Sequence, residues 1–385
     1  MKTPVVSVVH VVSGDLWGGA ENLVYQLVKQ QMLRPNMRVS VVILNRGQLH
    51  QELAKLGVPL LLLEEANNTF FSLLVASYRF VREWKEQGIQ DHFVIHGHRK
   101  KENLIAAFLA LRLRAKAVRT LHGGNEHSGP KAIKAKLSNC LEYLINKHFL
   151  QCNVAVSSEL QTALINEGFD NSRVKVIANG IDFANLGFMA EAQAENSQRL
   201  GRRSGRPFAV GIVGRLVPVK RHDIFLKIAE HLASKGELAE YYIVGDGPLY
   251  SELKKNIEEA GLASIVHLLG FQQNVYGILW QLDAVLILSD HEGLPLNLLE
   301  AIGLGVPVIG HAVGGVRELL ADYPAMLSYP PLENSASAAL HSLILGDPEY
   351  HAQFEVCQQN VKSKYSIQAC EKSYYSLYIS ISETN

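Results

Sequence analysis

Short apolar runs alternate with amphipathic stretches along almost the whole chain, and this alternation constrains the fold more than any other feature. In the first half the strand candidates are VVSVVHVV, RVSVVIL, VPLLLLE, HFVIHGH, AVRTLH, NVAVS and VKVIANG. Stretches with helical spacing, such as GAENLVYQLVKQQML and ENLIAAFLALRLRA, lie between them. The runs are apolar on both faces, as in a parallel sheet that helices cover on both sides. The sequence therefore predicts a doubly wound α/β fold.

One polar stretch, MAEAQAENSQRLGRRSGRP at 189–207, interrupts the alternation, which then restarts with FAVGIVG, YYIVGDG, IVHLLG, AVLILS, VPVIG and AMLSYP. A chain of 385 residues is also longer than one ordinary core requires. We therefore predict a first Rossmann-like domain over 1–188, a linker over 189–207 and a second domain over 208–365. The final helical pattern, about 348–380, is expected to supply a C-terminal helix at 366–385 that packs back on the first domain.

The composition indicates a packed globular protein, with 48% hydrophobic and 19% charged residues. No two cysteines form a CxxC pair, which argues against a disulfide framework or a zinc site and favours a reducing cytoplasm. The N-terminal stretch MKTPVVSVVHVVSGD is typical of a first strand and not of a signal peptide. No apolar run approaches the roughly 20 residues that a membrane-spanning helix needs. We expect a cytoplasmic protein.

The net charge of zero conceals an asymmetry between the two halves. Residues 1–190 hold 22 Lys and Arg against 15 Asp and Glu, which leaves 15 and 22 for residues 191–385. Much of the basic excess lies in 97–147. Solvated helix faces explain the excess as readily as a binding surface does. The sharper hypothesis is that the basic first domain meets an anionic surface, such as the inner face of the cytoplasmic membrane or a charged glycan. Nucleic acid is not expected, because no nucleic-acid motif accompanies the charge.

Open α/β sheets bind ligands at the carboxyl ends of their strands, so the loops that follow strands are the candidates for chemistry. Gly18 and Gly19 follow the first strand and precede a helix, where backbone amides could approach a phosphate; a tight turn without a ligand is the alternative. His122 ends another strand and is a candidate catalytic residue, or else a packed histidine. His96 and His98 end a third strand, but a metal site would want a further ligand, and the spacing suggests none.

Two cations follow the first strand of the second domain. The strand ends at Gly214, Arg215 follows it, and Lys220 comes five residues later near a helix start. Arg215 would offer a forked donor and Lys220 a point charge, a combination that could hold a diphosphate from two directions. The next strand ends in GDGP, in which Gly245 opens a sharp turn. By itself that turn is structural, although it could form one wall of a nucleotide pocket.

Two glutamates flank a strand-to-helix loop in SDHEGLPLNLLEAIGLG. Glu292 lies in the loop, and Glu300 lies two turns into the helix, about 12 Å further along its axis. Such a separation does not suit a close acid/base dyad, but it suits opposite ends of one extended ligand. The backbone amides of Leu296, Asn297 and Leu298 at the helix start could hold a phosphate between the two ends. A nucleotide-sugar fits this pattern.

Together these motifs resemble the retaining glycosyltransferases of family 4, and the resemblance covers nearly the whole chain. Its carriers are the Arg/Lys pair, the Glu-x7-Glu of 292–300, GDGP, NGID, GGAE near the start and GGVRE at 314–318. The resemblance implies the GT-B fold, in which two Rossmann-like domains face each other across a cleft and a C-terminal helix crosses back. It also implies that Arg215 and Lys220 stabilise the departing nucleoside diphosphate. Glu292 would contact the transferred sugar, and Glu300 would bind the ribose.

The resemblance assigns further residues to the donor site. His122 would lie near the donor sugar, the Gly18–Gly19 loop would close on the phosphates, and HLLGFQQN at 267–274 would hold the nucleobase. No metal or other cofactor is expected, because Arg and Lys take the role of a metal and no DxD triplet is present. The predicted catalytic residues are His122, Arg215, Lys220 and Glu292. The predicted donor-binding residues are Gly18, Gly19, Gly214, Gly245, Gly270, Phe271, Gly293, Leu294, Leu296, Asn297, Leu298 and Glu300.

The sequence thus predicts a retaining hexosyltransferase that moves a sugar, from UDP more than from GDP, to a glycan or lipid-linked acceptor in cell-surface polysaccharide or lipopolysaccharide synthesis. The cationic partners favour transfer over hydrolysis, since glycosidases place two carboxylates about 5–10 Å apart around the bond they cleave. Two alternatives stay open. A nucleotide-sugar epimerase can share the fold, and a non-catalytic module could bind the donor without using it.

Overall fold

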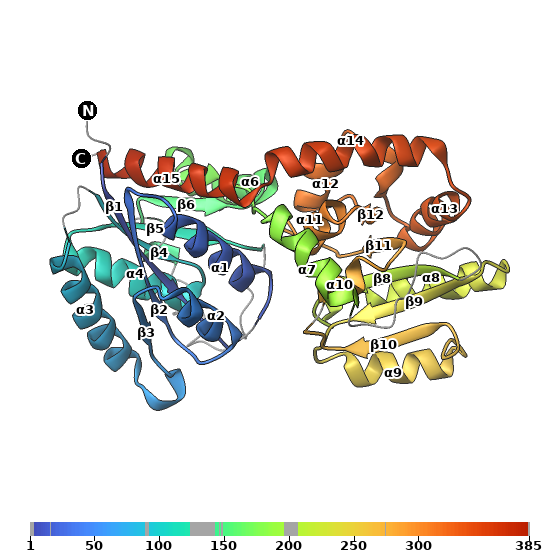
Figure 1. Cartoon of the computed structure of the whole chain (residues 1–385), viewed down its shortest axis with the longest axis horizontal. Helices are drawn as coiled ribbons and strands as arrows, with labels where there is room; N and C mark the ends of the chain where they lie inside the picture. The colour runs from blue at the N-terminus through green and yellow to red at the C-terminus, as the bar shows by residue number, and fades with distance from the viewer. Residues whose placement is uncertain are drawn as a thin grey trace. The chain divides into compact units, whose positions relative to one another are not determined.

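The computed structural model describes residues 4–15, 17–88, 92–123, 143–145, 147, 149–195, 207–273 and 275–383. The chain divides into two compact units. The first unit combines Met1–Gly180 with Ile367–Asn385, and the second is Ile181–Ser366. Each is a doubly wound parallel sheet, as the alternation of strands and helices predicts (Figure 1).

The first unit is built on a parallel sheet of seven strands in the order β3-β2-β1-β4-β5-β6-β7. Its strands are β1 (Val6–Val12), β2 (Met37–Ile43), β3 (Leu60–Leu62), β4 (His92–Gly97), β5 (Lys116–Leu121), β6 (Cys152–Ala155) and β7 (Val174–Val176). Every residue of β1 is buried, because helices cover both faces of the sheet at its centre. The order reverses between β1 and β4, which is where open α/β sheets bind their ligands.

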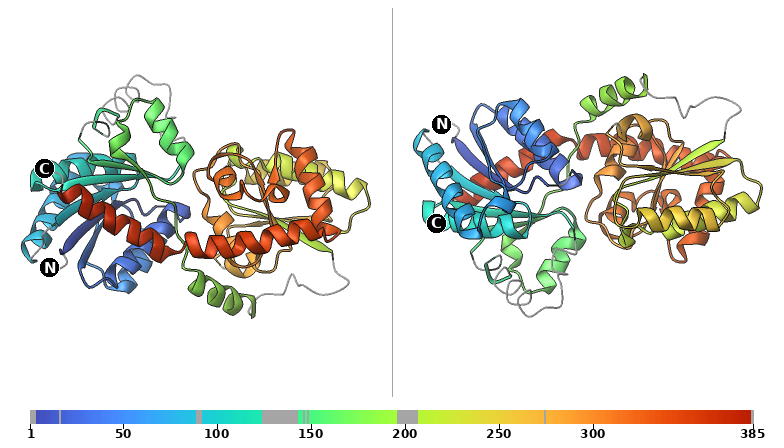
Figure 2. Two further views of the ribbon diagram at one scale, coloured as in Figure 1. Left: turned by 90° about the horizontal axis from the view of Figure 1, so that it is seen from above. Right: turned by 90° about the horizontal axis from the view of Figure 1, so that it is seen from below.

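Helices cover both faces of this sheet, and the two faces pack against different helices. Its helices are α1 (Gly19–Met32), α2 (Gln48–Leu56), α3 (Phe70–Glu86), α4 (Lys100–Leu113), α6 (Ser158–Asn166) and α15 (Ile367–Glu383). Val9 and Val11 of β1 join an apolar core with Trp84 of α3 and Leu109 of α4. The alternate side chain His10 points the other way, toward α1, because successive strand residues face opposite sides. Figure 2 shows α15, in red, lying along this unit.

The second unit repeats the design with six parallel strands in the order β10-β9-β8-β11-β12-β13. The strands are β8 (Phe208–Val213), β9 (Ala239–Val244), β10 (Val266–Gly270), β11 (Ala284–Ile287), β12 (Val308–His311) and β13 (Leu327–Ser328). The helices are α7 (Phe183–Glu195), α8 (His222–Ser234), α9 (Tyr250–Glu259), α10 (Val275–Leu279), α11 (Leu296–Gly303), α12 (Gly314–Leu320), α13 (Leu332–Ile344) and α14 (Pro348–Lys364). The order reverses between β8 and β11, so the loops after these strands lie at the ligand-binding edge.

One connection differs from the expected bounds. Residues 189–195, predicted to begin a linker, instead complete helix α7, because MAEAQAE consists of good helix formers. The remainder of that predicted linker, 196–206, lies outside the described residues. The final helical pattern is interrupted between α14 and α15, where Tyr365 ends the first helix and Ile367 begins the second. The first of these helices belongs to the second unit, and α15 belongs to the first.

Candidate functional site

At the ligand-binding edge of the second unit, the ends of three strands are tied together by backbone hydrogen bonds. Gly214 N donates to Val244 O over 2.9 Å, and Gly245 N donates to Gly270 O over 2.9 Å. Gly245 has a φ of 142°, and a Cβ there would lie 1.8 Å from Gly214 O. Only glycine allows this approach of one loop to the next. The GDGP turn is therefore required by the packing of two neighbouring loops.

Lys220 and Glu292, far apart in sequence, meet at this edge. Lys220 lies in the 3-10 turn Pro218–Lys220, just before α8, and its Nζ pairs with Glu292 Oε1. The same carboxylate oxygen accepts a hydrogen bond from Ser289 Oγ over 2.6 Å. Both side chains of the ion pair are largely but not wholly buried, with 22% and 13% of their area exposed. The structure thus joins the second cation to the first glutamate of the Glu-x7-Glu motif.

Arg215 lies close to Lys220 in the chain but is exposed, and its side chain forms no hydrogen bond or ion pair among the described residues. A guanidinium in this state is available for an external anion. The neighbouring Arg221, by contrast, is fixed by Asp223 and Asp290, with its Nη1 2.8 Å from Asp290 Oδ1. These two carboxylates raise the Arg221 pKa above its usual value. Arg221 therefore fastens the Lys220 turn to the loop of the glutamate.

The loop that carries Glu292 is held from its other side by helix α12. Gly315 N donates to Gly293 O over 2.7 Å. Gly314 has a φ of 49°, and a Cβ on it would lie 1.8 Å from Glu292 O. The GG of GGVRE thus lets one backbone lie directly on another. It fixes the carbonyl side of the glutamate loop while Lys220 and Ser289 hold its side chain.

Helix α11 begins at Leu296, so the amides of Leu296, Asn297 and Leu298 lie in its first turn as predicted, and Pro295 precedes the helix as its N-cap. No side chain caps this turn, which leaves its amides directed at whatever approaches. The Asn297 side chain is committed elsewhere, since its Nδ2 donates to Val213 O over 2.6 Å. The side chains of Leu294, Leu296 and Leu298 are buried in the core. These leucines can therefore contribute backbone groups only.

Glu300 is buried, and its Oε1 accepts a hydrogen bond from Tyr276 OH over 3.3 Å. Phe271 follows β10 directly and is 55% exposed. Gly270, with a φ of 67°, makes the turn that leads to it. Asn274, the last residue of the predicted nucleobase segment, lies outside the described residues. An exposed ring beside the paired loops is suited to stack on a planar ligand.

The ligand-binding edge of the first unit is formed by histidines. His122, at the end of β5, is half-buried, and its Nε2 lies 3.3 Å from His98 Nδ1. Burial, together with the nearby charge of Arg99, lowers the pKa of His122 to about 3. The imidazole is therefore neutral near pH 7.

The predicted glycine loop also lies at this edge. Gly18 precedes α1 as its N-cap residue, and Gly18 N donates to Glu21 Oε2 over 3.1 Å. Glu21 pairs with Arg99, whereas burial raises the pKa of its carboxyl group. Gly19 is exposed at the first position of the helix. The open amides that the GGAE motif predicts are thus partly occupied by its own glutamate.

A third histidine accompanies His96 and His98, although the spacing in the sequence suggests none. His10 of β1 lies beside them, and ring nitrogens of the three residues lie within 4.8 Å of one another. All three are buried. The sequence conceals this cluster because His10 and His96 lie inside apolar strands, and β1 and β4 become neighbours only through the order of the sheet.

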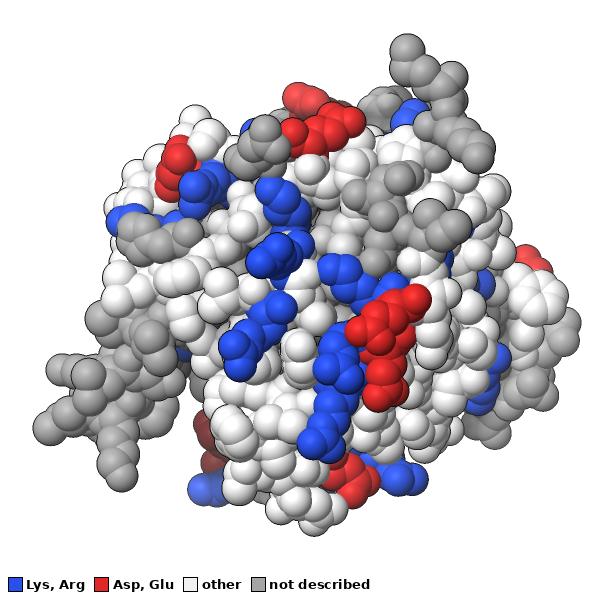
Figure 3. Space-filling model, turned by 90° about the vertical axis from the view of Figure 1, so that its left-hand side faces the viewer, with Lys and Arg blue, Asp and Glu red and all other residues white. Residues whose placement is uncertain are grey.

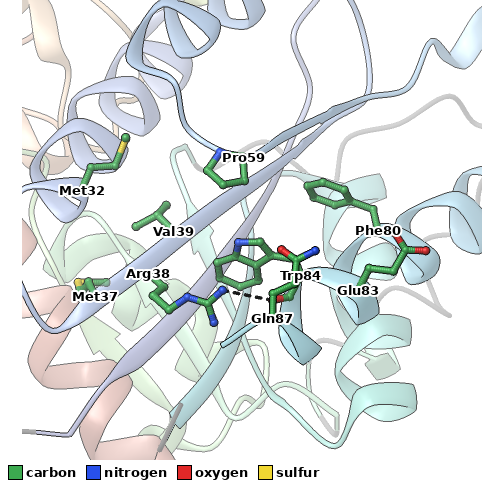
Figure 4. Close-up of a pocket in the computed structure, with 9 residues that line it drawn as sticks. All are labelled: Met32, Met37, Arg38, Val39, Pro59, Phe80, Glu83, Trp84 and Gln87. Carbon is green, nitrogen blue, oxygen red and sulfur yellow. Dashed lines mark hydrogen bonds between the residues drawn. The ribbon is translucent and has the colours of Figure 1, made fainter. Parts of the chain in front are cut away.

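A separate pocket of about 520 Å³ lies at the opposite edge of the first sheet, where strands begin (Figure 4). Its lining includes Met37 at the start of β2, Pro59 before β3, and Phe80 and Trp84 of α3. The Arg38 guanidinium lies 4.7 Å from the Trp84 ring centroid and donates to Trp84 O. No predicted site residue lines this pocket, so the sequence-based site and this pocket are distinct.

Two family profiles match consecutive, non-overlapping parts of this chain. The profile described as "Glycosyltransferase Family 4" matches residues 17–185, and the profile described as "Glycosyl transferases group 1" matches residues 193–358. The second match contains the Lys220–Glu292 pair and the whole Glu-x7-Glu motif. The chain belongs to glycosyltransferase family 4. It is a glycosyltransferase.

Named relatives agree with this membership. A Bacillus subtilis (strain 168) protein named as the glycosyltransferase EpsF is 26% identical over 309 residues, which cover 78% of this chain and 78% of EpsF. The Escherichia coli "UDP-Gal:alpha-D-GlcNAc-diphosphoundecaprenol alpha-1,3-galactosyltransferase" is 27% identical over 249 residues, covering 63% of this chain and 62% of the relative. Both alignments extend beyond one unit of the glycosyltransferase.

Solved structures show that the fold is GT-B. Anabaena HepE in complex with UDP and glucose aligns with a TM-score of 0.81 at 20% identity, covering 97% of this chain and 99% of HepE. WaaG, described as a glycosyltransferase involved in lipopolysaccharide biosynthesis, aligns with a TM-score of 0.65 at 14% identity over 95% of this chain and 98% of WaaG. The predicted fold and family are both confirmed.

Sequence reasoning missed several residues that hold the glycosyltransferase site in place. Ser289 lies two residues beyond the end of β11, and Tyr276 contacts Glu300 from helix α10. A polar residue at the end of an apolar run was the available signal for Ser289. Tyr276 carried no signal, because only the packing of α10 brings its hydroxyl to the glutamate.

Proposed function

We propose that this glycosyltransferase is a retaining enzyme that moves a hexose from UDP to a glycan or lipid-linked glycan acceptor, in the synthesis of a cell-surface polysaccharide or lipopolysaccharide. One observation carries the proposal above others: Lys220 and Glu292 meet at the ligand-binding edge of the second sheet, beside the open amides of α11. The E. coli relative's name specifies UDP-galactose and a diphosphoundecaprenol-linked acceptor, which supports the donor and acceptor classes.

Each residue of this edge has a definite task in the proposed reaction. The bond between the sugar and the β-phosphate oxygen breaks, and negative charge develops on the departing UDP. Arg215 is exposed and ready to bind one side of the diphosphate, and the amides of α11 offer donors at another. Lys220 would share its charge between Glu292 and the β-phosphate.

The same proposal assigns the remaining groups. Glu292, held by Ser289 and Lys220, would accept hydrogen bonds from hydroxyls of the transferred sugar. Glu300 would bind the ribose, and the exposed Phe271 ring would lie against uracil. In the proposed enzyme these cations take the place of a metal, so no metal is required. Retention means that the acceptor oxygen bonds to the anomeric carbon on the face that UDP leaves.

Calorimetric titration with UDP, GDP and ADP in the presence of EDTA tests the donor assignment. We expect one nucleotide, UDP, to bind, and Lys220→Ala or Glu300→Ala to weaken that binding at least tenfold, about 1.4 kcal/mol. Lys227→Ala is the matched control, because Lys227 is exposed on the outer side of α8. Tight binding of GDP instead would overturn the choice of UDP. Binding that requires added Mg²⁺ would overturn metal independence.

A transfer assay separates the enzyme from its two alternatives. The wild-type protein, a UDP-hexose and a diphosphate-linked lipid acceptor should yield an α-linked product. Conversion of the donor sugar to its epimer without any acceptor would support an epimerase. Nucleotide binding with neither reaction, and full biological function of Glu292→Gln, would support a non-catalytic donor-binding module.

We also propose that the basic first unit binds the anionic inner face of the cytoplasmic membrane. Figure 3 shows Lys and Arg side chains gathered on one face of the molecule. Arg112 and Arg114, at the end of α4, are exposed, and Leu111 beside them in the sequence is 69% exposed. Three basic residues of the predicted stretch, Lys131, Lys134 and Lys136, lie outside the described residues.

Not every cation of that stretch can serve this surface. Arg119 is fully buried and donates to Asn153, and Arg99 pairs with Glu21. Among the described residues, no helix combines the length and the apolar character needed to cross a membrane. Sedimentation with liposomes tests the proposal: we expect binding to anionic vesicles at low salt that declines as salt rises. Equal binding to neutral vesicles, or none to anionic ones, would overturn it.

A further inference from the structure

Three histidines and one glutamine form an unbroken chain of hydrogen bonds behind the ligand-binding edge of the first sheet. Gln31 Oε1 lies 2.8 Å from His10 Nε2, and His10 Nδ1 lies 2.9 Å from His98 Nε2. His98 Nδ1 in turn lies 3.3 Å from His122 Nε2. The chain therefore runs from helix α1, through β1 and the end of β4, to the histidine at the end of β5. It uses both ring nitrogens of His10 and of His98.

The rings of this chain are neutral. His10 is fully buried and His98 is 3% exposed, so charging either would leave a cation without water. Burial lowers the pKa of His10 to about 4 and that of His98 well below its usual value. A neutral imidazole carries one N–H and one lone pair. Each ring in the chain must therefore donate on one side and accept on the other.

The direction of the chain is fixed at Gln31. Its carbonyl oxygen can only accept, so His10 must carry its proton on Nε2 and present a lone pair at Nδ1. His98 must then donate from Nε2 and accept at Nδ1. The amide nitrogen of Gln31 is buried and has no hydrogen-bond partner among the described residues.

We infer that Gln31, His10 and His98 hold His122 as the tautomer protonated on Nε2, so that its Nδ1 is a hydrogen-bond acceptor for a hydroxyl group. The three residues position His122 and do not touch the substrate. The role of the hydroxyl as part of a bound sugar rests on the proposed function. The tautomer itself follows from the contacts alone.

A metal ion is the competing use of the same histidines, because ring nitrogens of His10, His96 and His98 lie within 4.8 Å of one another. The hydrogen bonds favour the chain. His96 Nδ1 lies 2.7 Å from Tyr378 OH, and His96 Nε2 lies 2.8 Å from Thr120 Oγ1. All six ring nitrogens thus have partners within the described residues. A metal would have to break the bond between His10 and His98 and one of the two bonds of His96.

The first test is the ¹⁵N spectrum of the full chain labelled at histidine, recorded near pH 7.5 without substrate. Two-bond and three-bond ¹H–¹⁵N couplings distinguish the two tautomers of each ring. We expect His10, His98 and His122 all to be protonated at Nε2, with assignments from His98→Asn and His122→Asn. An Nδ1–H signal from any of the three, or a protonated ring, would overturn the inference. This test needs no variant at Gln31 and no enzymatic activity.

Because free imidazole itself favours Nε2–H, substitutions at Gln31 provide the discriminating test. Gln31→Met removes the acceptor and would leave the His10 N–H buried without a partner, so the reversed chain becomes populated. His122 should then show an Nδ1–H signal. Gln31→Glu keeps an acceptor oxygen and should restore the wild-type tautomer. Gln30→Met, the same change one position earlier, is the matched control. Unchanged tautomers in Gln31→Met would overturn the inference.

Activity and metal content provide two independent readouts. If the acceptor at His122 serves a sugar hydroxyl, Gln31→Met should lower kcat/KM about tenfold, and Gln31→Glu should recover most of it. A wild-type rate in Gln31→Met despite a reversed tautomer would overturn the contact with the sugar.

Elemental analysis of protein purified without chelators should show no stoichiometric metal. One metal ion per chain, lost in His10→Ala, would overturn the chain in favour of a metal site. Correct tautomers without any transferase activity would count against the proposed function alone.

Discussion

At the ligand-binding edge of the first sheet three histidines are neutral and buried, whereas at the same edge of the second sheet a lysine, an arginine and a glutamate are partly open to solvent. His10, His96 and His98 are held in the first unit by hydrogen bonds between uncharged groups. In the second unit, Lys220 pairs with Glu292, and an exposed Arg215 lies beside them. Two sheets of one topological class thus carry opposite kinds of polar edge.

The difference shows that the parallel sheet decides where chemistry occurs, and the strand-end residues decide which chemistry it is. Fixed positive charge in a partly dry site stabilises an anion that develops during a reaction. Neutral imidazoles of fixed tautomer offer directed hydrogen bonds instead, without attracting ions. The charged edge therefore suits a diphosphate and the neutral edge suits hydroxyl groups. Four changes would break or sharpen this contrast.

The largest expected effect is the loss of the cation at the charged edge. Lys220→Ala should lower kcat for transfer on the order of 100-fold or more, because charge on the departing diphosphate is no longer compensated. Steady-state rates with a UDP-hexose donor measure it, and Lys227→Ala should retain the wild-type rate. A Lys220→Ala enzyme with unchanged kcat would mean that the Lys220–Glu292 pair is only structural.

The next effect comes from the backbone of the charged edge. Gly314→Ala places a methyl group against Glu292 O, in addition to the cost of a positive φ, and should destabilise the fold by about 3 kcal/mol. Gly346 has a φ of 77° but open space around it, so Gly346→Ala should cost about 1 kcal/mol. Urea unfolding followed by circular dichroism compares the two. Equal losses of stability in the two variants would show that the loop of Glu292 moves to accommodate a methyl group on α12.

Acid should weaken the neutral edge. The pKa of His10 is lowered to about 4 in the folded chain, against a usual value of about 6.5, so the unfolded chain binds more protons between these pH values. The free energy of unfolding is therefore unaffected by His10 above pH 6.5, and it declines as the pH falls from 6.5 toward 4. At pH 5, His10 alone should cost about 2 kcal/mol of the free energy of unfolding.

Tryptophan fluorescence can follow the two units separately during urea unfolding at pH 7.5 and pH 5. Trp280→Phe leaves Trp17 and Trp84, which report the first unit, and the double variant at those two positions leaves Trp280 to report the second. Among the described residues of the second unit, His222 alone has a histidine pKa lowered to about 4. The first unit should lose more stability. An equal loss in both units would remove the contrast.

The smallest effect concerns one hydrogen bond behind the neutral edge. Tyr378→Phe removes the phenol from His96 Nδ1 and should cost about 1–2 kcal/mol, because it leaves a buried ring nitrogen without a partner. Tyr375→Phe, on the same helix, breaks only a 3.5 Å contact with Pro4 O and should cost less than about 0.5 kcal/mol. Thermal unfolding distinguishes them. Equal stability of the two variants would indicate that His96 is satisfied in another way.

The fold was predictable because apolar runs of strand length mark both sheets, and their ends mark the loops that carry chemistry. Lys220 and Glu292 could be assigned to one edge, since β8 and β11 are the strands at which the sheet order reverses. Their direct pairing was not predictable, because it depends on the turn before α8. The same limit applies to Ser289, whose hydroxyl is aimed by the loop and not by the strand.

Elsewhere the sequence carries no usable signal. Arg119 reads as surface charge, but it lies inside β5, where it is fully buried against Asn153 and the Phe169 ring. His10 reads as an interruption of an apolar strand, yet it is the centre of a buried polar chain. In both cases the partner comes from a distant part of the chain, so local periodicity carries no information about it.

Helix α15 belongs to the first unit although it ends the described chain. Its Tyr374 and Tyr378 are buried and bond to Thr120 and His96. On a ribosome, therefore, the first sheet emerges early but lacks one covering layer until the second unit has been made. The second unit, which is continuous in sequence, has all its parts sooner. The protein's N-terminal half is thus the last to be completed, and premature termination within α15 would damage the region that was synthesised first.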